Sequence, residues 1–474
     1  MTTRARIELP FQDLIANSLH NHHLPTYFLL LAALAPGAGA WAMRLPSAIA
    51  GAFAATLGGA VGGTLGGRTA GLMSGLFLAA APVMVQSGQD ARPYAMELAL
   101  LLLALWGLIR LAGDPDAAGD TVWRGRLGPW LAFLVGTTGA LALSGDALPF
   151  LLVANLAAWP IAGRLPSGAR WRFVSRWIAT QVALLLLVAP LYIAMNHAVD
   201  GRFVEDFSWL PPPAVQRIWQ VGATVYLLRG ANMVSLELLP ASLPGFEAVV
   251  PLFALVGFVA LRRRPAAFLA MALAVLSLPA LLFLAHPSHP FLLPRYLLWS
   301  GAVFLIVAGV GAGSLVQQTV PRFGLLAPAG LAVLLLVNLR PYYKNETIPR
   351  WDIAATLLAS SIAAGAEVLA DQNGAPMMLR AYLPGGDTTL PRKRVLSDLS
   401  EAKASLREGH TVIAVHGPVG QGRATPSATF LAHVAALGVP AQKISAGKDI
   451  LLVRFNPPQA STPGLMQADV RSKP

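Results

Sequence analysis

Residues 70–105 read AGLMSGLFLAAAPVMVQSGQDARPYAMELALLLLAL, and they place a short polar stretch between two long apolar runs. The second run continues to residue 112, so each flank is about as long as a helix needs to be to cross a lipid bilayer, roughly 20 residues. The polar stretch, SGQDARPY at 87–94, carries Asp90 and Arg92. It fits a solvated loop with a surface ion pair, and it equally fits a site at a membrane surface. The spacing of the two charges does not decide between these interpretations.

The composition indicates an integral membrane protein. Of the 474 residues, 55% are hydrophobic and only 12% are charged, whereas soluble domains have about 25% charged residues. A net charge of +12 would suggest nucleic acid binding in a soluble protein, but cytoplasmic loops of membrane proteins collect Lys and Arg, so no nucleic acid partner is expected. The chain has no cysteine, which excludes disulfides and thiolate metal sites.

Ten segments are apolar and long enough to be membrane spans. They lie at 47–67, 70–87, 94–112, 129–144, 147–163, 177–196, 245–261, 265–285, 296–314 and 323–339. A shorter apolar segment at 26–42 is interrupted by Pro36 and Gly37, which favours a juxtamembrane or re-entrant piece over a full span.

The positive charges orient these spans. Alternate loops carry the arginines, and the positive-inside rule makes that side cytoplasmic. These loops contain Arg68, then Arg124 and Arg126, then Arg164, Arg170, Arg172 and Arg176, then Arg262, Arg263 and Arg264, and finally Arg322. The loops between them, including SGQDARPY and the long stretch 197–244, are therefore expected to be extracytoplasmic.

The chain changes character near residue 340. Helix-like runs at 351–370 and 427–438 alternate with strand-like runs at 411–418 and 449–455. We therefore expect an all-α polytopic membrane domain at 1–340 and a small extracytoplasmic α/β domain at 341–458. The last residues, 459–474, have the composition of a disordered tail.

Polar residues collect in four of the predicted extracytoplasmic loops, which can converge on one cleft beside the bilayer. They are His20, His22 and His23; Gln89, Asp90, Arg92 and Tyr94; Asp200, Arg202, Glu205, Asp206 and Trp209; and His286, His289, Arg295 and Tyr296. Cationic side chains bind phosphate, and a carboxylate can accept a proton from a hydroxyl. The set suits a charged, lipid-linked substrate.

Several features have plainer interpretations. The three histidines at 20–23 have no carboxylate at helical spacing, so a metal site is not favoured there. Arg295 with Tyr296 can be an interfacial anchor. The glycines of GGAVGGTLGG at 58–67 favour close packing of helices through small residues over a dinucleotide site. HGPVGQGRATP at 416–426 is interpreted as a turn rather than a phosphate loop.

Taken in order, the motifs resemble a known family. HHLPTYFLLL at 22–31, RLPSAIAGAFAATLGG at 44–59 and the stretch from 67 to 105 follow one another, and FSWLPPPAV, FLLPRYLLWSGAVFLIVAGVG and YYKNETIPRWDIAATLL come later. Together they resemble the multi-span glycosyltransferases of the GT-C fold, in the branch of bacterial relatives of protein mannosyltransferases and lipid A aminoarabinose transferase. The resemblance covers most of residues 20–360.

The resemblance implies a reaction. A sugar passes from a polyprenyl-phosphate donor to a lipid, glycan or protein acceptor on the extracytoplasmic face of the inner membrane, with the lipid phosphate as leaving group and with inversion at the sugar. Asp90 would be the catalytic acidic residue. The donor and its phosphate would be bound by His23, Arg92, Arg295, Tyr94, Tyr296 and Gln89. The other partners would be membrane lipids; no cofactor is implied with certainty, and a divalent cation stays open.

The sequence also departs from the family pattern. Members usually have a first span followed by an outer loop with an acidic pair. This chain starts too late to contain either of them. We interpret this difference as a truncated or mis-assigned start, or as the mark of an inactive protein. The alternatives to an enzyme are therefore an inactive membrane scaffold and a lipid or sugar transporter. A transporter should show inverted repeats and polar groups near the middle of the bilayer, and the sequence shows no internal duplication.

Overall fold

The computed structural model describes residues 3–34, 39–113, 127–199, 214–232, 235–285, 292–319, 326–371, 374–386, 388–418, 426–438, 440–447 and 449–458. The predicted disordered tail at 459–474, the acidic loop at 200–209 and the His286 and His289 pair lie outside the described residues. The chain divides into two compact units: a helical unit of residues 3–232 and 236–347, and a second unit that contains the chain from Ile348 onward.

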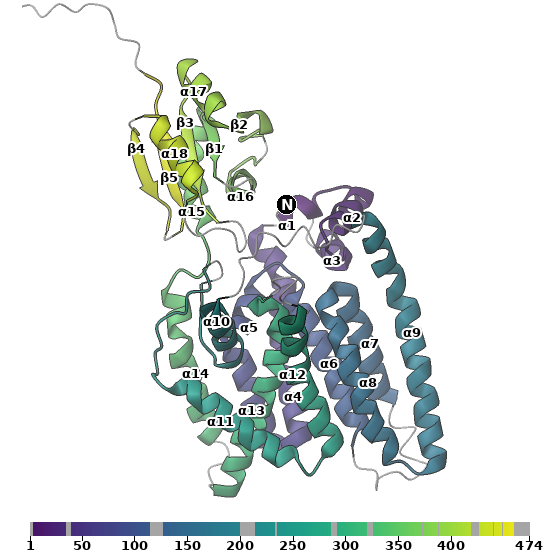
Figure 1. The fold of residues 1–474 in the computed structure, drawn as a ribbon. Helices are drawn as coiled ribbons and strands as arrows, with labels where there is room; N and C mark the ends of the chain where they lie inside the picture. The colour runs from purple at the N-terminus through teal and green to yellow at the C-terminus, as the bar shows by residue number, and fades with distance from the viewer. Residues whose placement is uncertain are drawn as a thin grey trace, which may run out of the picture. The chain divides into compact units, whose positions relative to one another are not determined.

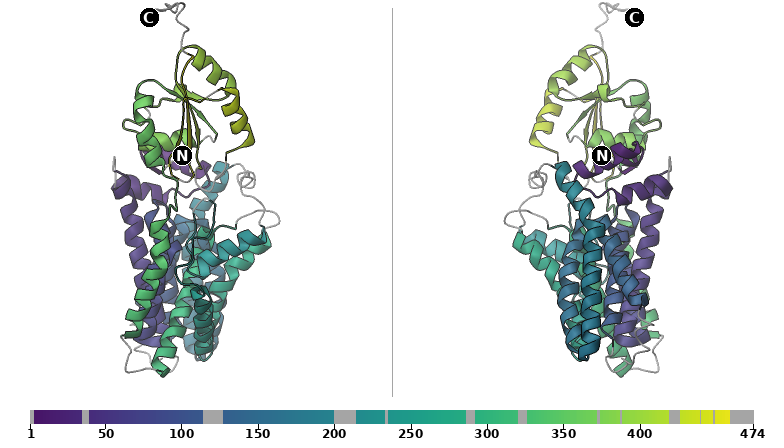
Figure 2. Two further views of the ribbon diagram at one scale, coloured as in Figure 1. Left: turned by 90° about the vertical axis from the view of Figure 1, so that its left-hand side faces the viewer. Right: turned by 90° about the vertical axis from the view of Figure 1, so that its right-hand side faces the viewer.

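The helical unit is built from helices that run side by side (Figures 1 and 2). The longer helices are α4 (Ala40–Ala80), α6 (Tyr94–Leu111), α7 (Leu127–Leu143), α8 (Leu148–Gly163), α9 (Ser167–Val199), α11 (Phe246–Leu261), α12 (Pro265–Ala285), α13 (Leu298–Thr319) and α14 (Leu326–Lys344). The short ones are α1 (Thr3–Ile7), α2 (Phe11–His20), α3 (Thr26–Leu34), α5 (Pro82–Gln89), α10 (Val215–Tyr226), η4 (Gly145–Ala147) and η6 (Pro294–Leu297). Among the described residues, seven helices are long and apolar enough to cross a membrane, and α7 and α11 are shorter apolar helices. The chain is a multi-pass membrane protein, as its composition predicts.

Helix α4 is a hairpin rather than one long rod. Its backbone leaves helical geometry at Gly67, where φ is 81°, a value that glycine adopts without strain. The halves before and after this residue pack against each other: a Cβ added at Gly71 would lie 2.7 Å from the carbonyl oxygen of Gly59 and 3.0 Å from the Cα of Gly63. The two spans predicted at 47–67 and 70–87 are therefore separated where expected, and the glycines allow close helix packing, as the sequence indicated.

Some helix boundaries differ from those predicted. Helix α9 begins at Ser167 instead of 177, so Arg170, Arg172 and Arg176 lie within its first turns and not in a loop. A pattern of apolar residues alone misses this, because long basic side chains at a helix end extend toward water while their backbone stays helical. Helix α10, within the predicted extracytoplasmic stretch 197–244, was not predicted.

The second unit is a mixed sheet with helices on both faces. Its strands are β1 (Glu367–Ala370), β2 (Val395–Leu396), β3 (Val412–His416), β4 (Gln442–Ser445) and β5 (Leu451–Phe455), in the order β2-β1-β3-β5-β4, with β1 parallel to β2 and β3 and with β5 antiparallel to β3 and β4. Its helices are α15 (Trp351–Ala363), α16 (Ala375–Tyr382), α17 (Leu399–Arg407) and α18 (Ala428–Ala436). Along β3, Ile413 and Val415 join one apolar core and Val412 and Ala414 join the other. This confirms the predicted α/β fold class.

One predicted element of this unit is wrong. The run 351–370 was expected to be helical throughout, but the helix ends at Ala363 and β1 begins at Glu367. Gly365 has a φ of 101°, which is the left-handed conformation that commonly terminates helices. The apolar residues that follow then pair with β3 in the centre of the sheet.

Candidate functional site

The polar loop between α5 and α6 is held by hydrogen bonds to its backbone. The hydroxyl of Thr3 donates to the carbonyl oxygen of Ala91 at 3.1 Å. The hydroxyl of Ser47 donates to the carbonyl oxygen of Arg92 at 3.1 Å, and Ser47 is in turn 2.8 Å from the buried hydroxyl of Tyr27. Helices α1, α3 and α4 therefore fix the position from which the Arg92 side chain extends.

Three cations gather around His23. Burial, followed by the positive charges of Arg92, Arg6 and Arg295, lowers the pKa of this imidazole to about 3. His23 is therefore neutral at physiological pH, and the permanent charges beside it are the three guanidinium groups. The structure thus brings together His23, Arg92 and Arg295, which the sequence predicted from three separate segments.

Arg6 belongs to this cluster and was missed by the sequence interpretation. It is only 3% exposed, and its guanidinium carbon lies 4.4 Å from the centre of the Phe28 ring. Its Nε and Nη1 atoms are buried, and neither has a hydrogen-bond partner in the described parts of the chain. Burial and the charge of Arg92 lower its pKa to about 10. No sequence signal marks Arg6 for burial, because its burial depends on how α1 packs on α3.

Arg295, in η6, lies between two of the predicted tyrosines. Its Nη2 donates to the Tyr296 hydroxyl at 3.2 Å. Its guanidinium carbon is 4.9 Å from the Tyr296 ring centre and 6.0 Å from that of Tyr94, which is within the range of cation–π attraction. The predicted residues Arg295, Tyr94 and Tyr296 therefore form one contact group.

A buried acidic pair lies next to this group and was also missed. Glu97 is 5% exposed in the first turn of α6, and it interacts electrostatically with Asp146 of η4. Both carboxyl groups interact with the Ser144 side chain, and Asp146 also interacts with Arg295. The carbonyl oxygen of Asp146 accepts a hydrogen bond from the Trp299 indole at 3.2 Å. Asp146 is thus fixed where it can orient Arg295.

Gln89 and Asp90 lie at the end of α5. Gln89 is exposed, and its side-chain oxygen accepts a hydrogen bond from the Tyr342 hydroxyl at 2.9 Å. Asp90 is half-buried and interacts electrostatically with Tyr27 and Tyr342. Within the described part of the chain no ion pair joins Asp90 to Arg92, so the simple surface ion pair considered from the sequence is not formed.

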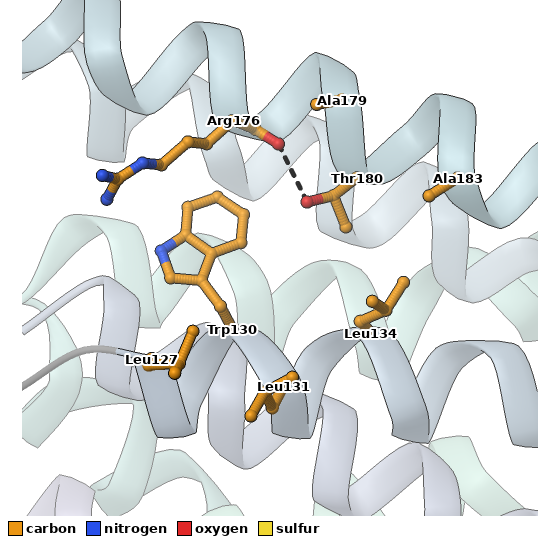
Figure 3. A pocket seen from close by; sticks show the side chains of 8 residues that line it. All are labelled: Leu127, Trp130, Leu131, Leu134, Arg176, Ala179, Thr180 and Ala183. Atoms are coloured by element: carbon orange, nitrogen blue, oxygen red, sulfur yellow. Dashed lines mark hydrogen bonds between the residues drawn. The ribbon is translucent and has the colours of Figure 1, made fainter.

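The described residues contain no group of three or more histidine and carboxylate side chains arranged to hold a metal ion. A groove of about 660 Å³ lies elsewhere, between α7 and α9 (Figure 3). Its lining residues are Leu127, Trp130, Leu131, Leu134, Arg176, Ala179, Thr180 and Ala183. Because it contains none of the predicted site residues, it is separate from the candidate site.

Comparison with known proteins gives the fold. No protein-family model and no curated protein sequence matches this chain. Among solved structures, ArnT from Cupriavidus metallidurans in the apo state matches with a TM-score of 0.58 and 15% identity, over 96% of this chain and 93% of that chain. ArnT from the same organism bound to undecaprenyl phosphate matches with a TM-score of 0.52 and 16% identity, over 92% and 87%. This chain has the GT-C fold, which confirms the family resemblance seen in its motifs at the level of fold.

Proposed function

We propose that this chain transfers a sugar from a polyprenyl-phosphate donor to an acceptor on the extracytoplasmic face of the inner membrane. The observation that carries the proposal is the convergence of His23, Arg92 and Arg295 from segments far apart in the sequence. Guanidinium groups bind phosphate through paired, charge-assisted hydrogen bonds. The GT-C fold, and a structure of that fold bound to undecaprenyl phosphate, support a lipid phosphate as the ligand.

The cluster suits departure of a lipid phosphate. As the bond between sugar C1 and the phosphate oxygen breaks, negative charge grows on the phosphate, and cations already fixed in place stabilise it. The sugar becomes oxocarbenium-like. Asp90 would accept the proton of the acceptor hydroxyl as that oxygen attacks C1 from the opposite face, which gives inversion. The acceptor can be a lipid, a glycan or a protein, and the chain leaves its identity open.

The location of the charged groups favours an enzyme over a transporter. Transport sites usually lie near the middle of the bilayer. Here Glu97 lies in the first turn of α6, and Asp146 and Arg295 lie in the short helices that precede α8 and α13. All three are therefore at helix ends, close to one surface, where a reaction on a membrane-bound donor would occur.

The test is sugar transfer in membranes supplied with prenyl-phosphate sugars. We expect Asp90→Asn and Arg295→Ala each to abolish transfer while the protein is still produced and folded. Arg263→Ala, at an exposed position in the loop before α12, is the matched control and should keep full transfer. Normal transfer by both site variants would refute the assignment.

A further inference from the structure

Arg6 is a buried cation, and no carboxylate of the described residues forms an ion pair with it. It is 3% exposed, and none of the residues that the structure describes forms a hydrogen bond with two of its nitrogen atoms, Nε and Nη1. The charge of Arg92, which acts on it, is also positive. Leaving a guanidinium buried and unpaired is costly, because the group has lost its water without gaining a counter-ion.

The location of Arg6 indicates what can satisfy it. Helix α1 is tied to the polar loop by the hydrogen bond from Thr3 to Ala91, next to Arg92. Arg6, Arg92 and Arg295 all act on the same imidazole, that of His23, and they come from α1, the α5–α6 loop and η6. The N–H groups of its guanidinium are donors for charge-assisted hydrogen bonds, and the oxygen atoms of a phosphate are acceptors that suit them.

We propose that Arg6 is a third arginine ligand of the lipid phosphate, completing with Arg92 and Arg295 a site that fits the departing phosphate better than the donor. This rests on the proposed function. The donor phosphodiester carries one negative charge. When its bond to C1 breaks, the electron pair stays on the phosphate oxygen and the phosphate gains a second charge, while the acceptor oxygen bonds to C1 and its proton passes to Asp90. Three fixed cations stabilise the second charge more than the first.

The proposal predicts opposite effects of Arg6→Met on stability and on binding. The thermal unfolding midpoints of the full-length wild type and of Arg6→Met would be measured in detergent. Each protein would be measured alone and with undecaprenyl phosphate, uncharged undecaprenol or inorganic phosphate. Without ligand, Arg6→Met should unfold at the same temperature as the wild type or higher, because an unpaired buried charge is removed. Its affinity for undecaprenyl phosphate should fall about tenfold or more.

Two further variants sharpen the test. Arg6→Lys keeps the positive charge but loses the planar guanidinium and its fixed donors, so it should lose less affinity than Arg6→Met. Arg110→Met is the matched control, because Arg110 also stacks on an aromatic ring, at 5.7 Å from Trp106, but is exposed at the last turn of α6. It should bind as the wild type does. Undecaprenol should change the unfolding midpoints of the wild type and of Arg6→Met by the same amount. Inorganic phosphate should raise the midpoint of the wild type but not that of Arg6→Met.

Two outcomes would overturn the inference. If Arg6→Met lowers the unfolding temperature of the free protein and leaves undecaprenyl phosphate binding unchanged, Arg6 is a structural residue. If binding of inorganic phosphate depends on Arg6 and binding of undecaprenyl phosphate does not, the site binds a free anion. A wild type that binds no undecaprenyl phosphate would instead refute the proposed function, and the inference with it.

Discussion

At the scale of single residues, His23 shows how the cluster controls its own charge. Its imidazole is surrounded by guanidinium groups, so a proton on it would add a further positive charge to the group. The folded protein therefore resists protonation of His23 until the pH is near 3, whereas a histidine in an unfolded chain takes up a proton below about 6.5. A neutral imidazole can still donate one hydrogen bond to a phosphate.

This difference in pKa predicts a dependence of stability on pH. Between pH 6.5 and 3 the unfolded chain binds a proton at His23 that the folded chain does not, so stability falls as the pH falls through this range. We expect the wild type to lose about 1 kcal/mol more than His23→Gln between pH 7 and pH 5, after allowing for solvent screening at this half-buried group. Thermal unfolding at both pH values measures this, and equal losses in the two proteins would show that His23 is not the responsible group.

At the scale of elements, the glycines of α4 decide whether its two halves can pack. A side chain at Gly71 would meet the backbone of the opposing half, as described above, and backbone atoms cannot move aside as a flexible side chain can. We expect Gly71→Ala to destabilise the protein by about 1–3 kcal/mol, as overpacking of a tight contact does.

The control for this prediction is Gly330→Ala in α14, where a Cβ would meet nothing within 4 Å. It should be neutral or slightly stabilising, because alanine favours helix over glycine. Denaturation of both variants in mixed detergent micelles provides the comparison. If the two substitutions cost the same, the hairpin does not depend on contact between its glycines.

The elements also show which parts of the fold could be predicted from the sequence. Long apolar runs predicted the spans, because a bilayer demands length and hydrophobicity that are visible along the chain. Strand β1 was missed, because its apolar residues follow a helix without a break in composition and only Gly365 separates the two. The acidic pair Glu97 and Asp146 was missed for a different reason: its partners are 49 positions apart, so only tertiary packing brings them together.

The candidate site was predictable to a similar extent. His23, Arg92, Arg295, Tyr94 and Tyr296 could be selected from motifs, and the structure places them in neighbouring positions. Arg6 could not be selected, because no local sequence pattern predicts that this arginine will be buried against a phenylalanine ring. Residues whose role depends on burial are the ones that local sequence patterns cannot identify.

At the scale of the whole molecule, the topology proposed from the basic loops can be tested directly, because the chain contains no cysteine. Single cysteines placed at Arg263 and at the exposed Lys443 of β4 would report on the proposed cytoplasmic and extracytoplasmic sides. In cells whose outer membrane has been made permeable and whose inner membrane is intact, a membrane-impermeant maleimide should label Lys443→Cys at once. It should label Arg263→Cys only after the inner membrane is opened, and the reverse pattern would invert the proposed topology.

The proposed function is tested most directly by following the donor phosphate itself. Phosphorus NMR distinguishes the phosphodiester of a polyprenyl-phosphate sugar from the phosphomonoester that remains after transfer. We predict that the purified wild-type protein, given a panel of such donors with cell-envelope acceptors, converts one diester signal into a monoester signal, and that Arg295→Ala does not. If every diester signal persists with the wild type, or if Arg295→Ala converts the donor equally well, sugar transfer at this cluster is contradicted.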